Sequence, residues 1–142
     1  MKNYKLILIA VLGVIFLASC NNDSGEITKI PGINDFTENS PAVANALNSL
    51  SFAVVANKYN QALEYPINFD RLNATIALTV SGLTAGDLSI QVYSDTKQLL
   101  YNADFNQNIT LTQPIIFDEK PTKVKFIFNT LTANFSCALS VK

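Results

Sequence analysis

Apolar and polar residues alternate along most of the chain between residues 63 and 141. In one such segment, Ile76, Leu78 and Val80 lie on one face, and the residues between them lie on the other. A period of two residues indicates β-strands that bury one face. From residue 63 onward the pattern predicts about eight short strands, namely 63–69, 74–80, 87–93, 98–101, 108–112, 114–117, 123–129 and 134–141.

Turn signals separate these predicted strands, as in the segments 81–86 (SGLTAG) and 118–122 (DEKPT). Such spacing is typical of sandwiches and barrels. Alternation on one face favours antiparallel sheets with a dry inner side and a solvated outer side. We therefore expect an all-β fold, a single antiparallel β-sandwich of jelly-roll or immunoglobulin-like type, over residues 42–142. Pro66 should confine its strand to a sheet edge or a bulge.

The segment 41–57 fits two interpretations. Ser40 followed by Pro41 looks like the start of a helix, and apolar residues recur at helical spacing up to Val54. The residues Leu50, Phe52 and Val54 also alternate as in a strand. We expect a short helix or turn near 41–48 and a strand from about 50 to 57, although periodicity alone does not decide between them.

The first residues follow a different pattern. Lys2 and Lys5 precede an uncharged apolar run at residues 6–18, and small residues follow. This is the layout of a secretory signal. The run is too short for a transmembrane helix, which needs about 20 residues.

The apolar run ends in Leu17, Ala18, Ser19 and Cys20. This sequence resembles the lipobox of bacterial lipoproteins. The resemblance implies cleavage between Ser19 and Cys20, a diacylglyceryl group on the Cys20 thiol and acylation of the new amino group. Cys20 would then anchor the protein to a membrane. The alternative is an ordinary secretory signal that ends in a cysteine by chance.

These observations divide the chain into a lipoprotein signal peptide (1–19), a lipidated N-terminus with a polar tether (20–41) and the sandwich (42–142). The tether is rich in Asn, Asp, Ser, Gly and Pro, which disfavours a packed element. Residue Asn21 follows Cys20. In the enterobacterial lipoproteins that the signal resembles, Asp at that place retains the protein in the inner membrane. We therefore expect a bacterial envelope protein at the outer membrane, on its periplasmic or surface face.

Composition excludes several functions. The sequence has 10 Lys and Arg, 11 Asp and Glu, and no His or Trp. Scattered lysines in a mildly acidic chain do not suit a phosphate backbone, so we expect no nucleic-acid partner. Without histidine, Ser-His-Asp and Cys-His catalysis are excluded. We expect no enzyme activity, no cofactor and no metal.

The two cysteines allow two arrangements. If lipid occupies Cys20, then Cys137 has no partner in the chain, and its place in an alternating run predicts a buried, inert thiol. A disulfide between Cys20 and Cys137 is the alternative in an oxidising compartment.

The region from about residue 60 to 142 also resembles a known kind of module. The segments 65–69, 74–80 and 84–90, a strand into Tyr101 and the closing segment 126–141 resemble the pre-peptidase C-terminal β-sandwich modules of secreted bacterial proteases. The resemblance implies a jelly-roll-like sandwich and implies nothing about function.

Candidate ligand-binding residues are few. The rings of Tyr93 and Tyr101 could form an exposed platform for a sugar or a peptide, with Tyr93 on the outward face of its strand. The alternative is that tyrosine simply favours half-buried strand positions. Acidic loops such as the one at Asp118 and Glu119 would need six to eight converging oxygens to bind calcium, and no calcium-loop motif is present.

The sequence therefore favours a non-enzymatic envelope lipoprotein. Its sandwich would bind a protein or a glycan, or would serve as an accessory subunit of an envelope assembly. A lipid-anchored inhibitor of the immunity type and a fimbrial or adhesive subunit are alternatives. A small anchored hydrolase fits least well, because no nucleophile motif is visible.

Overall fold

The computed structural model describes residues 37–141, in which every regular element is a β-strand. The strands are β1 (Ala42–Ala46), β2 (Ser49–Pro66), β3 (Asn73–Ser94), β4 (Leu99–Phe105), β5 (Ile109–Ile116) and β6 (Pro121–Val141). All pairings between them are antiparallel. Within this range, no helix is long and apolar enough to cross a membrane.

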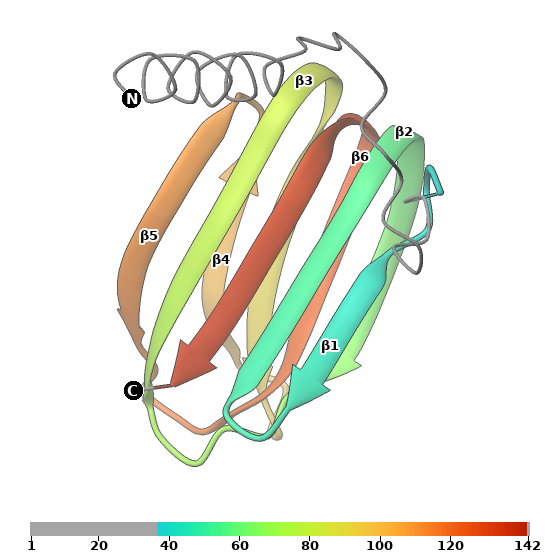
Figure 1. Ribbon diagram of the computed structural model, residues 1–142. Coiled ribbons are helices and arrows are strands. Elements are labelled where there is room, and N and C mark those ends of the chain that lie inside the picture. Colours follow the sequence, from blue (N-terminus) through green and yellow to red (C-terminus); the bar gives the residue numbers. More distant parts are fainter. Residues whose placement is uncertain (1–36, 142) are drawn as a thin grey trace, which may run out of the picture. The chain divides into compact units, whose positions relative to one another are not determined.

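The strands β2, β3 and β6 pass through both layers of the fold, because each bends near its middle (Figure 1). The front layer has the order β1, β2, β6, β3, β5 and uses the first halves of β2 and β3 and the second half of β6. The back layer has the order β2, β6, β3, β4 and uses the remaining halves. One continuous sheet is thereby folded over into a sandwich.

Backbone with positive φ marks the bends. The angles are 51° at Lys58, 63° at Gly82, 78° at Gly86 and 51° at Thr130. The pairing registers of β2 and β3 with β6 shift in the same regions, as β-bulges produce when they turn a strand. Gly86 also allows a close approach, because a Cβ there would lie 2.3 Å from the carbonyl oxygen of Asn129.

The core lies between the layers and is rich in phenylalanine. Phe52 of the front layer stacks on Phe126 of the back layer, with ring centroids 4.4 Å apart, and both side chains are buried. Phe128 and Phe135 join this cluster. Offset and edge-on ring contacts of this kind add to the stabilisation from buried area. The same apolar core therefore supports both outer faces.

The predicted fold class, an all-β antiparallel sandwich, is confirmed by the strand pairing. The prediction of about eight short strands is wrong in its division of the chain, because six strands are present and three of them are long. The predicted turn at 81–86 is a bend inside β3 rather than a break between strands. Pro66 ends β2 where this strand forms an edge of the back layer, as predicted.

The expectation of a helix or turn near 41–48 is wrong. Ala42–Ala46 forms β1, which pairs with the start of β2 through a tight turn at Leu47 and Asn48. The side chain of Asn48 accepts a hydrogen bond from the backbone of Asp70 at 2.9 Å, and its φ is 65°. Pairing with a neighbouring strand therefore outweighs the local helical spacing of the apolar residues.

Two predictions concern cysteines. Cys137 is buried with 4% of its surface exposed, which confirms that its thiol lies in the core. Burial raises the pKa of the thiol to about 12, and its inertness stays a prediction. The signal peptide, Ser19 and Cys20 lie outside the described residues, so lipidation stays a prediction.

Candidate binding site

The outer face of the front layer carries small side chains in register across its strands. Residues on it alternate with the buried core residues, so their side chains point away from the core. One row consists of Ala42, Ala53, Ser136, Thr79 and Thr110. The next row consists of Ala44, Ser51, Ala138, Ala77 and Thr112.

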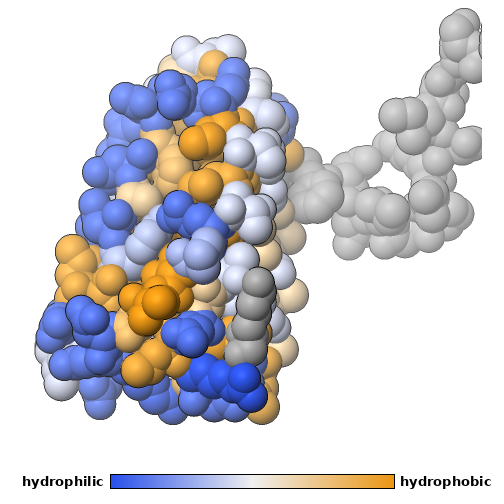
Figure 2. All heavy atoms as spheres, turned by 90° about the vertical axis from the view of Figure 1, so that its left-hand side faces the viewer, coloured by the Kyte–Doolittle hydropathy of each residue, from blue (hydrophilic) through white to orange (hydrophobic). Residues whose placement is uncertain are grey.

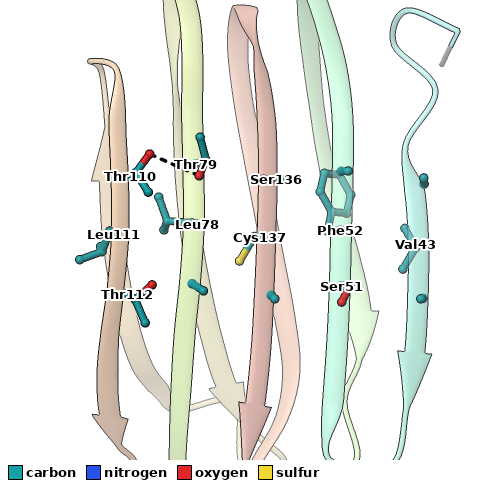
Figure 3. A pocket seen from close by; sticks show the side chains of 15 residues that line it. Val43, Ser51, Phe52, Leu78, Thr79, Thr110, Leu111, Thr112, Ser136 and Cys137 are labelled. Atoms are coloured by element: carbon teal, nitrogen blue, oxygen red, sulfur yellow. Dashed lines mark hydrogen bonds between the residues drawn. The ribbon is translucent and has the colours of Figure 1, made fainter. Parts of the chain in front are cut away.

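These two rows line a shallow trough of about 550 Å³ that crosses the front layer from β1 to β5 (Figure 3). A smaller hollow of about 170 Å³ continues it past Val55 and Asn134 and shares Ala53, Thr79 and Ser136 with it. The trough forms because the outward side chains of the two rows are no larger than threonine. The residues between the rows also line it, namely Val43, Phe52, Leu78, Leu111 and Cys137. Its volume lies within the range of small-molecule sites, roughly 300–1,000 Å³.

The chemistry of the trough is uncharged. Outward positions of the front layer within residues 37–141 carry no Asp, Glu, Lys or Arg and no aromatic ring. The rows carry a mixture of hydroxyl and methyl groups instead. The hydroxyl oxygens of Thr79 and Thr110 lie 3.4 Å apart, and a dashed line marks their hydrogen bond in Figure 3. Those of Ser51, Thr112 and Ser136 make no hydrogen bond to another described residue.

A further polar atom lies in the row beside the trough. The Oγ1 atom of Thr75 is buried and has no hydrogen-bond partner among the described residues. Thr75 pairs with Ser140 and Pro114 on the neighbouring strands. A buried hydroxyl without a partner is costly, so the front layer keeps polar groups that its own structure does not satisfy.

The outer face of the back layer is built differently, because its polar groups bond to one another. Ser89 donates a hydrogen bond to Asp104 at 2.5 Å, and Gln91 donates one to Asn102 at 3.1 Å. Lys123 and Lys125 lie 2.9 and 3.3 Å from the carboxylate oxygens of Glu64. These two contacts hold the pKa of the Glu64 carboxyl below its ordinary value, the bond from Lys123 having the larger effect.

The structure places the two predicted tyrosines on different faces of the back layer. Tyr93 points outward, as predicted, where its hydroxyl donates to Gln91 at 2.7 Å and Lys123 Nζ lies 5.3 Å from its ring centroid. Tyr101 pairs with buried Val92 and packs against the core. They form no common platform, and a ligand-binding role for either stays a prediction.

Tyr101 joins the two layers at one edge of the sandwich. Its hydroxyl accepts a hydrogen bond from Gln113 of β5 at 3.0 Å, and burial raises the pKa of the phenol. Apolar side chains gather between hydrophilic ones on this edge (Figure 2). The most exposed of them, Ile116 on β5 and Leu99 on β4, have 76% and 48% of their surface exposed. These two side chains belong to different layers of the sandwich.

The described residues contain no group of three or more His, Cys, Asp or Glu side chains that could hold a metal ion. Glu119 of the acidic loop accepts a hydrogen bond from Thr96 at 3.2 Å. The acidic side chains that the structure describes therefore belong to pairs and turns rather than to a converging ligand set.

Sequence reasoning missed the trough, although a signal was present. The outward positions of 74–80 and 134–140 carry only Ala, Ser, Thr and Asn, whereas those of 123–129 carry Lys123 and Lys125. A strand with no charge on its outward face differs from an ordinary solvated strand. Only the pairing of strands distant in sequence shows that several such faces adjoin.

Comparisons with known proteins give limited similarity. No protein-family model and no curated protein matches the sequence. Among solved structures, a family 6 carbohydrate-binding module is similar with a TM-score of 0.42 and 17% sequence identity, covering 77% of this chain and 87% of that chain. We take the fold from the strand pairing itself.

Proposed function

We propose that this protein is a non-enzymatic lipoprotein of the bacterial envelope that binds a protein or glycan partner through the trough. The observation that carries the proposal is the combination of unpaired hydroxyls and a hollow, uncharged floor around Ser136. A surface that satisfies its own polar groups gains little from a ligand, whereas unpaired groups gain hydrogen bonds when a ligand supplies partners.

Binding without catalysis fits the residues of the trough. Its hydroxyl side chains, such as Ser51 and Thr112, have no general base beside them, because no outward position of the described front layer is titratable. A serine or threonine nucleophile needs an adjacent base or a lowered pKa. Hydroxyl and methyl groups held on a rigid sheet are suited to recognition.

The lipid anchor completes the proposal. Cys20 would hold the tether in the membrane, and the sandwich would present the trough to its partner. Replacing Cys20 with alanine should release the protein from membranes, which fractionation in the presence of high salt would show. A Cys20→Ala protein that stays with the membrane under these conditions would contradict the anchor.

Site-specific photo-crosslinking in the native host tests the trough. A benzophenone side chain at Thr112, exposed in the trough, should form an adduct with the partner, whereas one at Asn102, exposed on the back layer, should not. Adding Ala138→Arg to the Thr112 probe should abolish the adduct, because a charge would then occupy the floor. An adduct that forms equally from both probe positions and survives Ala138→Arg would contradict the proposal.

A further inference from the structure

Resting on the proposed binding function, we infer that the ligand of the trough is a neutral glycan, an uncharged chain of sugar rings laid across the strands of the front layer. The inference depends on charge, hydrogen-bonding capacity and shape. Each of these properties argues against one class of ligand.

The lack of charge in the trough argues against ionic ligands. A charged group that enters a site without a counter-charge loses hydration and gains no ion pair. The trough floor, with Ala138 and Ser136 on the central strand β6, offers no such counter-charge. The charged side chains Glu64, Lys123 and Lys125 lie on the outer face of the back layer instead. The complement of an uncharged trough is an uncharged ligand.

The hydroxyl groups of the trough argue against purely apolar ligands such as acyl chains. An acyl chain in the trough would cover the hydroxyls of Ser51, Ser136 and Thr112 and would leave them without partners, which is costly. A sugar ring supplies hydroxyl groups that donate and accept, together with C–H surface that can contact the methyl groups of Ala53 and Ala138. The floor carries both hydroxyl and methyl groups, which matches that mixed surface.

The concave shape of the trough argues against a second copy of this chain as its ligand. Two troughs facing each other would enclose a void, because the outward side chains in the two rows of each floor are no larger than threonine. A protein partner would need a protruding segment free of charge, whereas about a quarter of the residues of an average protein are charged. Strong protein contacts also centre on large anchors in deep pockets, and this trough is shallow. A flexible sugar chain can follow a shallow floor.

The pairing geometry also suits a polymer. The rows run perpendicular to the strands, so equivalent positions recur at the strand spacing of about 4.8 Å. Ser136 on β6 and Thr79 on β3 are register partners, and Thr110 follows on β5. A chain of sugar rings along this row would meet a hydroxyl group on each of the strands β6, β3 and β5. Phe52 lines the trough but is buried, and no aromatic ring of the described front layer points outward. Hydrogen bonds must therefore carry most of the affinity.

Affinity electrophoresis of the full-length protein in detergent tests the inference. The gels contain a neutral β-1,3-glucan, a neutral β-1,4-xylan or a neutral α-1,4-glucan, or the carboxymethylated form of each. We expect retardation by at least one neutral polymer and a loss of at least about tenfold in affinity for its carboxymethylated form. Failure of all the neutral polymers to bind, or preference for a carboxymethylated form, would overturn the inference.

Matched serine variants assign the binding to the trough. Ser136→Ala removes an unpaired hydroxyl from the floor and should weaken retardation about three- to tenfold. Ser89→Ala removes a hydroxyl on the back layer that is already bonded to Asp104, and retardation should be unchanged. A glycan that binds both variants like the wild type would overturn the inference.

The same experiments separate the two proposals. If no neutral glycan binds but the photo-crosslink at Thr112 captures a protein and is lost with Ala138→Arg, the glycan inference fails and the proposed function stands. If the crosslink is insensitive to Ala138→Arg and Ser136→Ala does not change retardation, both fail, because the trough is then not the binding site.

Discussion

On the outer face of the back layer, Ser89 donates a hydrogen bond to Asp104, whereas on the outer face of the front layer Ser136 has no partner among the described residues. Both serines lie on central strands of the same folded sheet. The back layer pairs Glu64 with two lysines, and the front layer has no charge to pair. The two faces therefore share a backbone architecture and differ in whether their polar side chains satisfy one another.

The comparison shows that polarity alone does not identify a binding surface. Alternation places polar residues outward on both faces. A self-bonded network such as Gln91 with Asn102 and Tyr93 stabilises the fold but leaves few groups for a ligand. Unpaired hydroxyls over a hollow contribute little to the fold and remain available. Substitutions that act on the two faces unequally can test this difference.

The largest effect is expected from the core that both faces share. Replacing Phe52 with alanine removes its stacking on Phe126 and leaves a cavity, which should cost about 3–5 kcal/mol in the free energy of unfolding. Chemical denaturation would measure the loss. Both faces should be affected together, so a variant that loses only ligand binding and keeps its stability would contradict a common core.

The bends that join the faces should give the next largest effect. Gly86→Ala would place a Cβ 2.3 Å from a backbone oxygen at a φ of 78°, and we expect a loss of about 3 kcal/mol. Gly82→Ala is the matched control, since its nearest contact would be a side-chain atom at 3.7 Å, and only its φ of 63° is unfavourable. That variant should lose about 1–2 kcal/mol. Equal losses in thermal or denaturant unfolding would refute the close approach at Gly86.

The matched serines should show opposite behaviour. Ser89→Ala breaks its bond to Asp104 and should reduce stability by about 0.5–1.5 kcal/mol. Ser136→Ala breaks no hydrogen bond to another described residue and should leave stability nearly unchanged, while it weakens ligand binding. Denaturation curves of both variants check the pair. A larger stability loss for Ser136→Ala would show that its hydroxyl is structural.

The smallest effect concerns pH. Bonds from Lys123 and Lys125 lower the pKa of Glu64 from its ordinary value of 4.5. A carboxyl with a lowered pKa in the folded state contributes stability that is complete above the ordinary value and is lost as the pH falls through the lowered one. The melting temperature should therefore fall less steeply in acid for Glu64→Gln than for the wild type. An unchanged acid profile in this variant would show that the ion pairs contribute nothing measurable.

The affinity for the ligand should not depend on pH in the way that stability does. Among the described residues that line the trough, the one titratable side chain is that of Cys137, and burial raises the pKa of its thiol to about 12. Affinity for a neutral ligand should therefore stay constant from about pH 5 to about pH 9. Binding measured over this range with the folded protein checks the expectation. An affinity that changes with pH over this range would indicate that the ligand binds to the charged back layer.

Local pattern was sufficient to predict which residues face the core. The alternation around Ile76 and Leu78 and the position of Cys137 predicted burial, and all three side chains are buried. The same pattern did not predict that β3 is continuous, because the segment 81–86, which contains Gly82 and Gly86, has the composition of a turn. Whether such glycines end a strand or bend it depends on the strand that pairs across them, here β6.

The trough could not be predicted for a related reason. Alternation shows that Ser136 and Thr79 point outward from their strands, but it does not show that they are neighbours. That pairing joins residues far apart in the sequence. The same holds for Tyr93, which the pattern placed outward correctly, while its contacts with Gln91 and Lys123 became visible only in the folded sheet.

The central claim is that the ligand lies on the front layer, and hydrogen–deuterium exchange of the full-length protein with and without the retained polysaccharide tests it most directly. The account predicts protection of peptides from the second half of β6 and the first halves of β2 and β3, around Ser136, Ser51 and Thr79. Peptides around Gln91 and Asn102 should exchange at an unchanged rate. Protection confined to Gln91, Asn102 and Tyr93 would contradict the account and would place the ligand on the back layer.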